Sequence, residues 1–309
     1  MSDHSILFRI RRKLRYLFRL IFLSLYRRFR AQAWVMDLLN RKSRTAYTSI
    51  RPKLSVLEQR IAQDLIRDGL SISHLDELFP GADSIVSLKR FVETEFSSAQ
   101  VGRNKTFLEF LWDNAPRFDL NNPVFKFGLE PKLLHIVNAY LGLFARFVFF
   151  SVNRTKVITD STQAQGSQRW HRDPSWGDQR MCKVFIYLSD VDTVGGGPFT
   201  YVKGSHKTGK WAGRFPASSA YGFYPQDGAV ESSDMASSIF PCTGRAGNVV
   251  FCDTTGLHKG GLSISKERVM ITYHYVSPAS IQEPNWTGEV SSQGVESLPE
   301  LSRGSLLRS

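Results

Sequence analysis

From residue 146 onwards the chain consists of short segments rich in β-branched and aromatic residues, and this pattern limits the possible folds more than any other feature. Turns that contain Gly, Pro or Asp separate the segments, as is typical of neighbouring strands. The predicted strands cover residues 146–152, 181–188, 199–202, 247–251 and 269–276. Many short strands with such turns predict a mainly β core, folded as a barrel or jelly roll.

The part of the chain before residue 146 has a helical pattern instead. Residues 53–67 repeat apolar side chains at helical spacing, and Gly69 is a residue that can end this helix. Further helices are predicted over residues 84–95, 106–112 and 131–140, with a short strand at 70–73. We therefore expect N-terminal helices that support the β core.

Composition agrees with one large domain or with one domain plus an appendage. The chain has 309 residues, of which 42% are hydrophobic, and this is enough to bury a sizeable core. The three cysteines are too few and too irregularly spaced for a disulfide framework, so a reducing compartment, the cytoplasm, is expected. No CxxC motif or Cys/His cluster indicates a zinc site.

The positive charge of the chain is concentrated in its N-terminal segment. Residues 1–44 contain 12 Lys and Arg against Asp3 and Asp37, whereas the remainder of the chain is close to neutral. Within residues 6–30, apolar side chains recur on one helical face and arginines gather on another. The longest apolar run, residues 20–26, is far shorter than the roughly 20 residues that cross a bilayer.

We expect residues 1–44 to be a basic amphipathic helical segment, with residues 6–30 lying on an anionic membrane surface. The protein would then be cytoplasmic and peripherally membrane-associated. Two alternatives remain: the helix packs on its own domain or on a partner, or it is a cleaved organelle presequence or signal peptide. Nucleic-acid binding is not expected, because the stretch contains so many Leu and Phe residues.

Three further segments have the composition of connections. Residues 45–52 are polar and are expected to be a linker. Residues 217–238, rich in Ser, Tyr and Gly, are predicted to form a loop or lid over the mouth of the barrel. The Ser-, Glu- and Gly-rich residues 282–309 are predicted to be a disordered polar tail.

One group of side chains has the spacing of metal ligands. His171 and Asp173 are two residues apart, so on a strand both would face the same side while Arg172 points away. His258 follows a predicted strand, within a glycine-rich bend. Two histidines and one carboxylate form the facial triad of non-haem Fe(II) oxygenases, and Arg268 could clamp the distal carboxylate of a 2-oxoglutarate co-substrate.

The blocks around these residues resemble a known family. They are QRWHRDPSW (168–176), GPFTYVKGSH (197–206), HKGGLSISKER (258–268) and TYHY (272–275). In this order they resemble the phytanoyl-CoA dioxygenase family of Fe(II)/2-oxoglutarate-dependent oxygenases. Shorter similarities lie at 65–69 and 133–142, so the resemblance spans roughly residues 53–278.

The resemblance implies a double-stranded β-helix, of the jelly-roll or cupin-like type, with a dioxygenase domain at 53–281. It implies iron ligation by His171, Asp173 and His258, and binding of the 2-oxoglutarate C5 carboxylate by Arg268, with O₂ as the second co-substrate. The chain departs from the family pattern at Lys203, at 195–196 and at Lys259. None of these departures removes an iron ligand.

Three other residues are candidates for the substrate pocket. Trp176 could wall the cavity, although a tryptophan is more often part of a core. Lys183 could meet an acidic substrate, or it could be solvated. His206 is expected to close a turn near the rim of the barrel, and a place beside the substrate is the alternative.

The expected reaction is oxidative decarboxylation of 2-oxoglutarate coupled to hydroxylation of a C–H bond. The basic helix suggests a lipid or a lipid-linked sugar at a membrane surface as the substrate. The same site acting on a soluble small metabolite is an alternative, as are desaturation and ring closure. A non-catalytic jelly roll that docks through the basic helix is a competing hypothesis, and the sequence predicts neither the substrate nor the oligomeric state.

Overall fold

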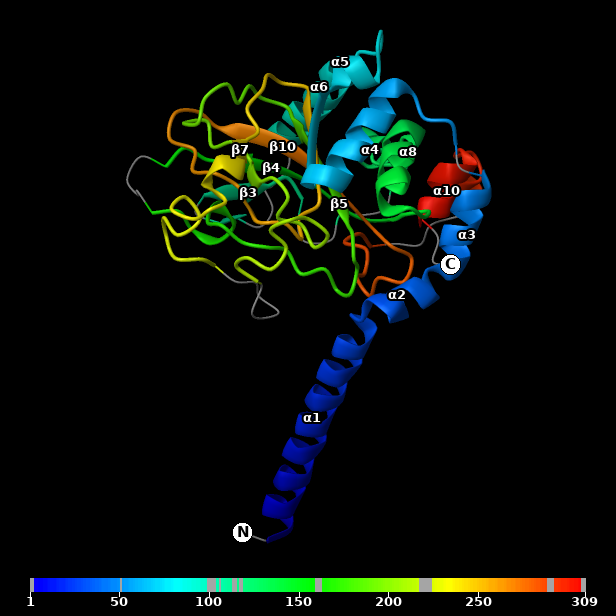
Figure 1. Ribbon diagram of the computed structural model, residues 1–309, viewed down its shortest axis with the longest axis vertical. Helices are drawn as coiled ribbons and strands as arrows, with labels where there is room; N and C mark the ends of the chain where they lie inside the picture. Colours follow the sequence, from blue (N-terminus) through cyan, green and yellow to red (C-terminus); the bar gives the residue numbers. More distant parts are fainter. Residues whose placement is uncertain are drawn as a thin grey trace.

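The computed structural model describes residues 3–50, 52–98, 104–105, 107–112, 116, 119–158, 163–216, 224–287 and 292–306. A β sandwich forms the body, helices cover one side of it, and a long N-terminal helix projects away from it (Figure 1). The helices are α1 Asp3–Arg30, α2 Ala33–Leu39, α3 Arg41–Ile50, α4 Val56–Asp68, α5 Leu75–Leu78, α6 Ser84–Ser98, α7 Pro123–Phe127, α8 Pro131–Leu141, α9 Ser292–Val295 and α10 Glu300–Leu306.

The strands form two antiparallel sheets. The larger sheet has the order β1-β8-β5-β10-β4-β3-β2, and the smaller has the order β7-β6-β9. The strands are β1 Leu70–His74, β2 Asn104–Lys105, β3 Leu108–Phe110, β4 Arg146–Thr155, β5 Cys182–Tyr187, β6 Thr200–Val202, β7 Ile239–Pro241, β8 Asn248–Cys252, β9 His258–Lys259 and β10 Arg268–Val276. This arrangement confirms the predicted mainly β core, a double-stranded β-helix supported by N-terminal helices.

The two faces of the larger sheet pack against different cores, because successive side chains of a strand point to opposite sides. On β10, Ile271, Tyr273 and Tyr275 belong to the large core that the sheet shares with α4, α7 and α8. The alternate residue Met270 faces the smaller sheet, in a second core with Phe199 of the neighbouring loop. The inner face of β10 therefore points into the sandwich, where a site can be enclosed.

Local signals explain the helices that cover the outer face of the larger sheet. In α4, the Ser55 side chain accepts from the Glu58 backbone N–H and the Glu58 carboxylate accepts from the Ser55 backbone N–H, while Gly69 ends the helix with a φ of 71°. In α8, Pro131 occupies the first turn. The predictions for residues 53–67 and 131–140 agree with these helices.

Three predictions about individual elements are wrong. Residues 106–112 were expected to be helical, but Leu108–Phe110 is strand β3, paired with β4. The expected linker at 45–52 lies largely in α3, which buries Tyr47 against the body. The expected disordered tail at 282–309 contains α10, whose residues Ser302 and Leu306 are buried. In each case packing on the body decides the structure of a segment whose own sequence signal is weak.

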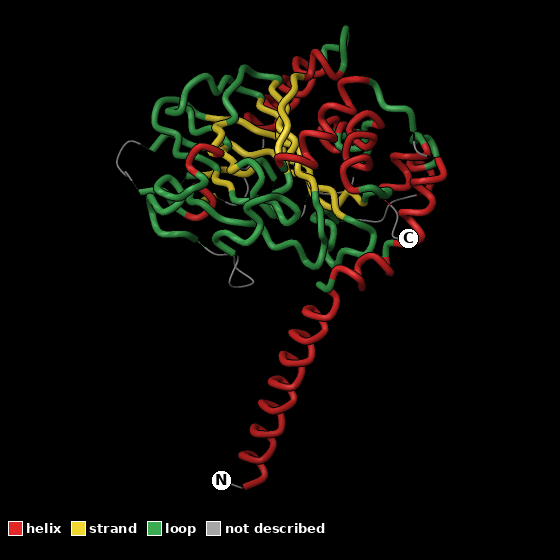
Figure 2. The backbone as a smooth tube through the Cα atoms, viewed as in Figure 1, coloured by secondary structure: helices red, strands yellow, loops and turns green. Residues whose placement is uncertain are grey.

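The predicted lid at 217–238 is described only in part. Residues 217–223 lie outside the described residues, and 224–238 form a run of turns that ends in a short 3-10 helix, Ala236–Ser238 (Figure 2). Val230 and Met235 of this run are buried in a small core with Trp170 and Leu257. This segment thus packs beside the residues that flank His171 and His258.

Candidate metal centre and co-substrate pocket

Backbone pairing brings His171 and His258 face to face. The two residues form an isolated antiparallel bridge, and each backbone N–H donates to the carbonyl of the other over 2.9 Å. Their ring centroids lie 4.3 Å apart. Asp173 follows as extended chain, and its backbone N–H donates to Thr254 O over 2.9 Å. The expectation that His171 and Asp173 lie on a regular strand is wrong, but the bridge still places both side chains toward His258.

The three side chains converge on one point. His171 Nε2 lies 3.8 Å from Asp173 Oδ1, and His258 Nε2 lies 3.6 Å from Asp173 Oδ2. The ligand atoms of the three residues all lie within 4.8 Å of one another, and no other His, Cys, Asp or Glu group in the described part of the chain meets this criterion. Such spacing fits a single metal ion held on one side by protein.

The backbone also orients the two imidazole rings. His171 Nδ1 lies 2.8 Å from Arg169 O, and His258 Nδ1 lies 2.9 Å from Gly256 O. A carbonyl can only accept, so each Nδ1 carries the hydrogen and each Nε2 keeps its lone pair toward the centre. Both rings are therefore in the tautomer that a metal ion requires.

Electrostatics favour the same protonation states. Burial alone would raise the pKa of Asp173, but the charge of Lys183, with smaller contributions from His258 and His171, holds that pKa well below its usual range. Burial, assisted by His171, lowers the pKa of His258 to about 3. At neutral pH the centre therefore offers a carboxylate and a neutral His258, as metal binding requires.

Arg268 is a buried cation at the start of β10. Its guanidinium donates to Gly197 O, to Gly260 O at 2.5 Å and to Thr155 Oγ1 at 3.1 Å. Its Nε is buried without a hydrogen-bond partner, and no carboxylate of the described residues pairs with it. A buried cation without a counter-ion is costly, so the site fits an anionic group from outside the chain.

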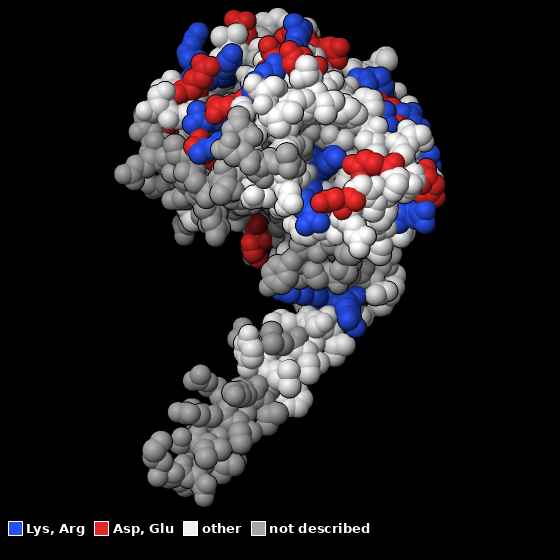
Figure 3. Space-filling view, turned by 90° about the vertical axis from the view of Figure 1, so that its left-hand side faces the viewer, with Lys and Arg blue, Asp and Glu red and all other residues white. Residues whose placement is uncertain are grey.

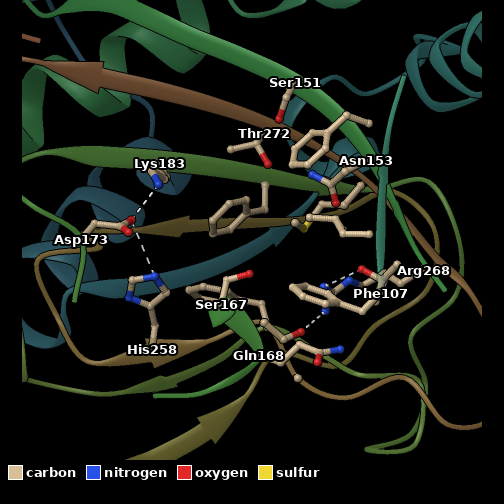
Figure 4. A pocket seen from close by; sticks show the side chains of 18 of the residues that line it. Phe107, Ser151, Asn153, Ser167, Gln168, Asp173, Lys183, His258, Arg268 and Thr272 are labelled. Atoms are coloured by element: carbon tan, nitrogen blue, oxygen red, sulfur yellow. Dashed lines mark hydrogen bonds and ion pairs between the residues drawn. The ribbon is translucent and has the colours of Figure 1, made fainter. Parts of the chain in front are cut away.

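The triad and Arg268 line one cavity of about 210 Å³. Figure 4 shows Asp173 and His258 at one end of this cavity and Arg268 at the other. A dicarboxylate with one end on a metal ion and the other on Arg268 would span the cavity. The chain's residues therefore fit both iron(II) and 2-oxoglutarate.

Of the three residues that were expected in the substrate pocket, only Lys183 lines the cavity. The Lys183 Nζ lies 2.7 Å from Asp173 Oδ2. Trp176 does not line the cavity, because its ring instead lies under the Arg27 guanidinium of α1, 5.7 Å away. His206 does not line it either, because it is fully buried beneath α4, with Nε2 3.3 Å from Ile66 O.

Most of the cavity wall was not recognised in the sequence. Alternate residues of β4 and β10 supply much of it, so a period of two along these strands was the available signal. The wall residues from these two strands are Phe149, Ser151, Asn153, Thr155, Met270 and Thr272. Phe107 and Phe110 also line the cavity, and they lie in the segment that was wrongly expected to be helical.

Solved structures share this fold. The epimerase SnoN, in complex with Fe³⁺, alpha-ketoglutarate and nogalamycin RO, has a TM-score of 0.55 at 15% identity over 74% of this chain and 87% of that chain. EctD from S. alaskensis with bound Fe has a TM-score of 0.52 at 16% identity, over 76% and 82%. EctD with 2-oxoglutarate and 5-hydroxyectoine gives 0.52 at 17% identity, over 76% and 80%.

A comparison with curated proteins finds no match. The profile of the phytanoyl-CoA dioxygenase (PhyH) family, in contrast, matches residues 90–269, which is more than half of the chain. The matched region includes the triad and Arg268. The chain therefore belongs to the phytanoyl-CoA dioxygenase family and is an enzyme that depends on iron(II) and 2-oxoglutarate, with O₂ as co-substrate.

Proposed function

We propose that His171, Asp173 and His258 hold the iron(II), that Arg268 binds the distal carboxylate of 2-oxoglutarate, and that the enzyme hydroxylates a C–H bond of its substrate. The observation that carries this proposal is the shared cavity, which has three converging side chains at one end and, at the other, a buried arginine that pairs with no carboxylate of the described residues. Family membership speaks against the competing hypothesis of a non-catalytic docking protein.

Bound iron(II), 2-oxoglutarate and O₂ would supply the oxidation: 2-oxoglutarate would lose CO₂ and take up one oxygen atom of O₂ to become succinate, and the other oxygen atom would enter the substrate. The chain's own residues bind and orient. His171 and His258 present Nε2 from a rigid backbone bridge, and Arg268 fixes the direction in which 2-oxoglutarate lies. Aromatic side chains such as Phe149 and Phe199 keep water from the reacting carbon.

Anaerobic addition of iron(II) and 2-oxoglutarate tests the assignment of the site. We expect a visible charge-transfer band in the native enzyme and its loss in His171→Ala and in Asp173→Ala, because each variant removes one of the proposed ligands. Asp192→Ala is a matched control, since Asp192 pairs with Lys266 away from the cavity. An unchanged band in both ligand variants would refute the assignment.

Product analysis separates hydroxylation from related outcomes of the same site. A screen for succinate release over membrane lipid and glycolipid extracts, with Asp173→Ala as the blank, identifies a substrate. The product's mass then decides: a gain of one oxygen atom indicates hydroxylation. A loss of two hydrogens, found instead, would indicate desaturation or ring closure and contradict the proposed reaction.

We also propose that α1 lies on an anionic membrane surface and that the substrate is a lipid or a lipid-linked sugar. Two observations support this proposal: α1 projects from the body (Figure 1), and the described part of α1 exposes apolar side chains. Phe18 and Phe22 are 69% and 68% exposed, and Leu25 is 58% exposed. These residues are spaced by three or four positions and share one helical face.

The charges of α1 complement such a surface. Figure 3 shows an uncharged stretch of the described part of α1, with Lys and Arg side chains where it meets the body. Arg27, Arg28 and Arg30 occupy the last turn. Basic groups that flank an exposed apolar face are suited to headgroups above a shallow apolar layer. Among the described residues, no helix is long and apolar enough to cross a membrane.

Vesicle sedimentation tests the docking of the full-length protein. We expect binding to vesicles that contain phosphatidylglycerol, weaker binding at high salt, and loss of binding when Phe18, Phe22 and Leu25 are all changed to Ser. Changing Val194 and Ile264 to Ser is the control, because both are exposed apolar residues of the body. If the triple variant still sedimented like the native protein, α1 would not be the docking element.

A soluble small metabolite is the second candidate substrate. The neighbouring structures of SnoN and EctD contain nogalamycin RO and 5-hydroxyectoine, so this fold accommodates such molecules. The two candidates differ in one outcome of the same screen. Succinate release by the aqueous metabolite fraction, without release by the lipid fraction, would favour the soluble substrate.

A further inference from the structure

Lys183 is a second cation in the candidate active site. It lies on β5 and lines the same cavity as the triad and Arg268, with Nζ 2.7 Å from Asp173 Oδ2. Apart from the two histidines, the charged residues of the described lining are Asp173, Lys183 and Arg268. The wall itself therefore carries one more positive than negative charge.

Filling the site does not remove this excess. Iron(II) adds two positive charges, and the two carboxylates of 2-oxoglutarate add two negative charges. Asp173 has a single charge, which the metal ion and Lys183 would share. Counted over the described lining residues, one positive charge stays uncompensated in a largely apolar cavity, and an enclosed charge that is not balanced is costly.

Two hydroxyl groups lie on the same side of the cavity as Lys183. Ser151 on β4 and Thr272 on β10 are directly opposite each other in the sheet register, and both line the cavity. Thr272 is two residues from His274, the β10 residue that pairs with Lys183. Neither hydroxyl has a hydrogen-bond partner among the residues that the structure describes, and Figure 4 shows both groups along one side with Lys183.

We propose that the substrate carries one negative charge close to the carbon that is oxidised, as a carboxylate or a phosphodiester, and that Lys183, Ser151 and Thr272 receive it. This inference rests on the proposed function, because it counts the charges of iron(II) and 2-oxoglutarate. The anion balances the remaining positive charge, and the two hydroxyls donate to its oxygens. Phe110, Phe149 and Met270 then contact the apolar part of the substrate.

The test uses the full-length enzyme with iron(II) and 2-oxoglutarate under anaerobic conditions. The charge-transfer band is formed first and is then titrated with hexanoate, with hexanamide and with hexyl methyl phosphate. We expect an anion to perturb the band at a concentration roughly tenfold lower than the neutral amide, because a charge-assisted hydrogen bond contributes about this much to binding. The anion that perturbs the band at the lower concentration indicates whether the site prefers a carboxylate or a phosphodiester.

Variants show whether Lys183 and its neighbours cause the preference. In Lys183→Met the anion should lose its advantage over the amide, and Lys183→Arg should restore part of it. Thr272→Val should reduce the advantage while leaving the contact between Lys183 and Asp173 intact. This second variant keeps the test decisive if Lys183→Met no longer binds iron.

Several outcomes would overturn the inference. One is equal binding of anion and amide by the native enzyme, including no effect of either. Another is an anion effect that persists in both Lys183→Met and Thr272→Val, since the anion would then be bound directly by iron. A third is a weaker affinity of Lys183→Met for 2-oxoglutarate with no change toward hexanoate, which would assign Lys183 to the co-substrate. Failure of the band to form at all would instead contradict the proposed function.

Discussion

At the scale of single residues, the site depends on the protonation states that burial and backbone contacts impose. The Nδ1 atoms of His171 and His258 face carbonyl oxygens, so the chain fixes both tautomers without using another side chain. The carboxylate of Asp173 stays ionised although it is largely enclosed, because Lys183 lies beside it. The ligands are thus prepared by their surroundings before a metal ion binds.

His274 gives a prediction about pH and stability. It is buried on β10, and burial, together with the nearby Lys183, lowers its pKa to about 3 from 6.5. Between these two pH values the unfolded chain binds a proton that the folded chain does not, so stability falls as the pH falls through this window. At pH 5 the loss from this residue would be about 2 kcal/mol.

Urea unfolding of the metal-free protein at pH 7 and pH 5 checks this prediction. We expect the native protein to lose stability on acidification and His274→Leu to lose about 2 kcal/mol less. The comparison concerns the change between the two pH values, so an overall loss of stability in the variant does not affect it. Equal acid sensitivity of both proteins would show that His274 accepts a proton in the folded state.

At the scale of elements, one carboxylate joins the two chain segments that carry the histidines. Glu231 accepts a hydrogen bond from Trp170 Nε1 over 2.7 Å and one from Lys259 Nζ over 3.0 Å. Trp170 precedes His171, and Lys259 follows His258, so both side chains lie on the face of the bridge opposite the ligands. The segment 224–238 is thereby held against the metal centre from outside.

Removing this contact should weaken metal binding without touching a ligand. We expect Glu231→Ala to raise the iron(II) dissociation constant by about tenfold, as is typical when a group behind a metal ligand is lost. Glu231→Gln should have an intermediate effect, because its amide oxygen can still accept from Trp170. Asp234 lies in the same segment and forms an exposed ion pair with Arg214, so Asp234→Asn is the control. An affinity of Glu231→Ala equal to that of the control would contradict the prediction.

The sequence predicted the elements whose signals are local. The strand of residues 269–276 is rich in β-branched and aromatic residues, and the helix of 53–67 has its cap and its terminating glycine. Residues 106–112 form a short apolar run, which has no period that separates strand from helix, and only pairing with β4 decides it. The triad could be predicted because metal ligands have a characteristic residue type and spacing in the sequence. Ser151 and Thr272, in contrast, lie together only because of the sheet register.

At the scale of the whole molecule, the N-terminal helices are attached to the chain that follows Asp173. The Arg27 guanidinium stacks over Trp176, and Arg30 donates to Ala279 O. A side chain at Gly177 would meet Arg30 O at 3.2 Å, so the helix end and this turn are in close contact. Trp176 was expected in the substrate pocket, and the structure shows that it instead contacts the end of α1 and helps to hold this helix on the body.

This attachment gives the projecting helix a defined direction relative to the body. Val35 and Met36 of α2 are buried, while Trp34 on the same helix is 61% exposed. The outward side of α2 therefore continues the apolar surface of α1 toward the body. If α1 docks on a membrane, α2 would bring the catalytic body to the same surface rather than leave it on a flexible tether.

The central claim is that His171, Asp173 and His258 together hold the iron. Anomalous diffraction at the iron absorption edge, from crystals grown anaerobically with iron(II) and 2-oxoglutarate, tests it most directly. We predict one strong peak between His171 Nε2, His258 Nε2 and the Asp173 carboxylate, with electron density for 2-oxoglutarate running from that peak to Arg268. A peak at other residues, or none at the triad in iron-loaded protein, would contradict the account.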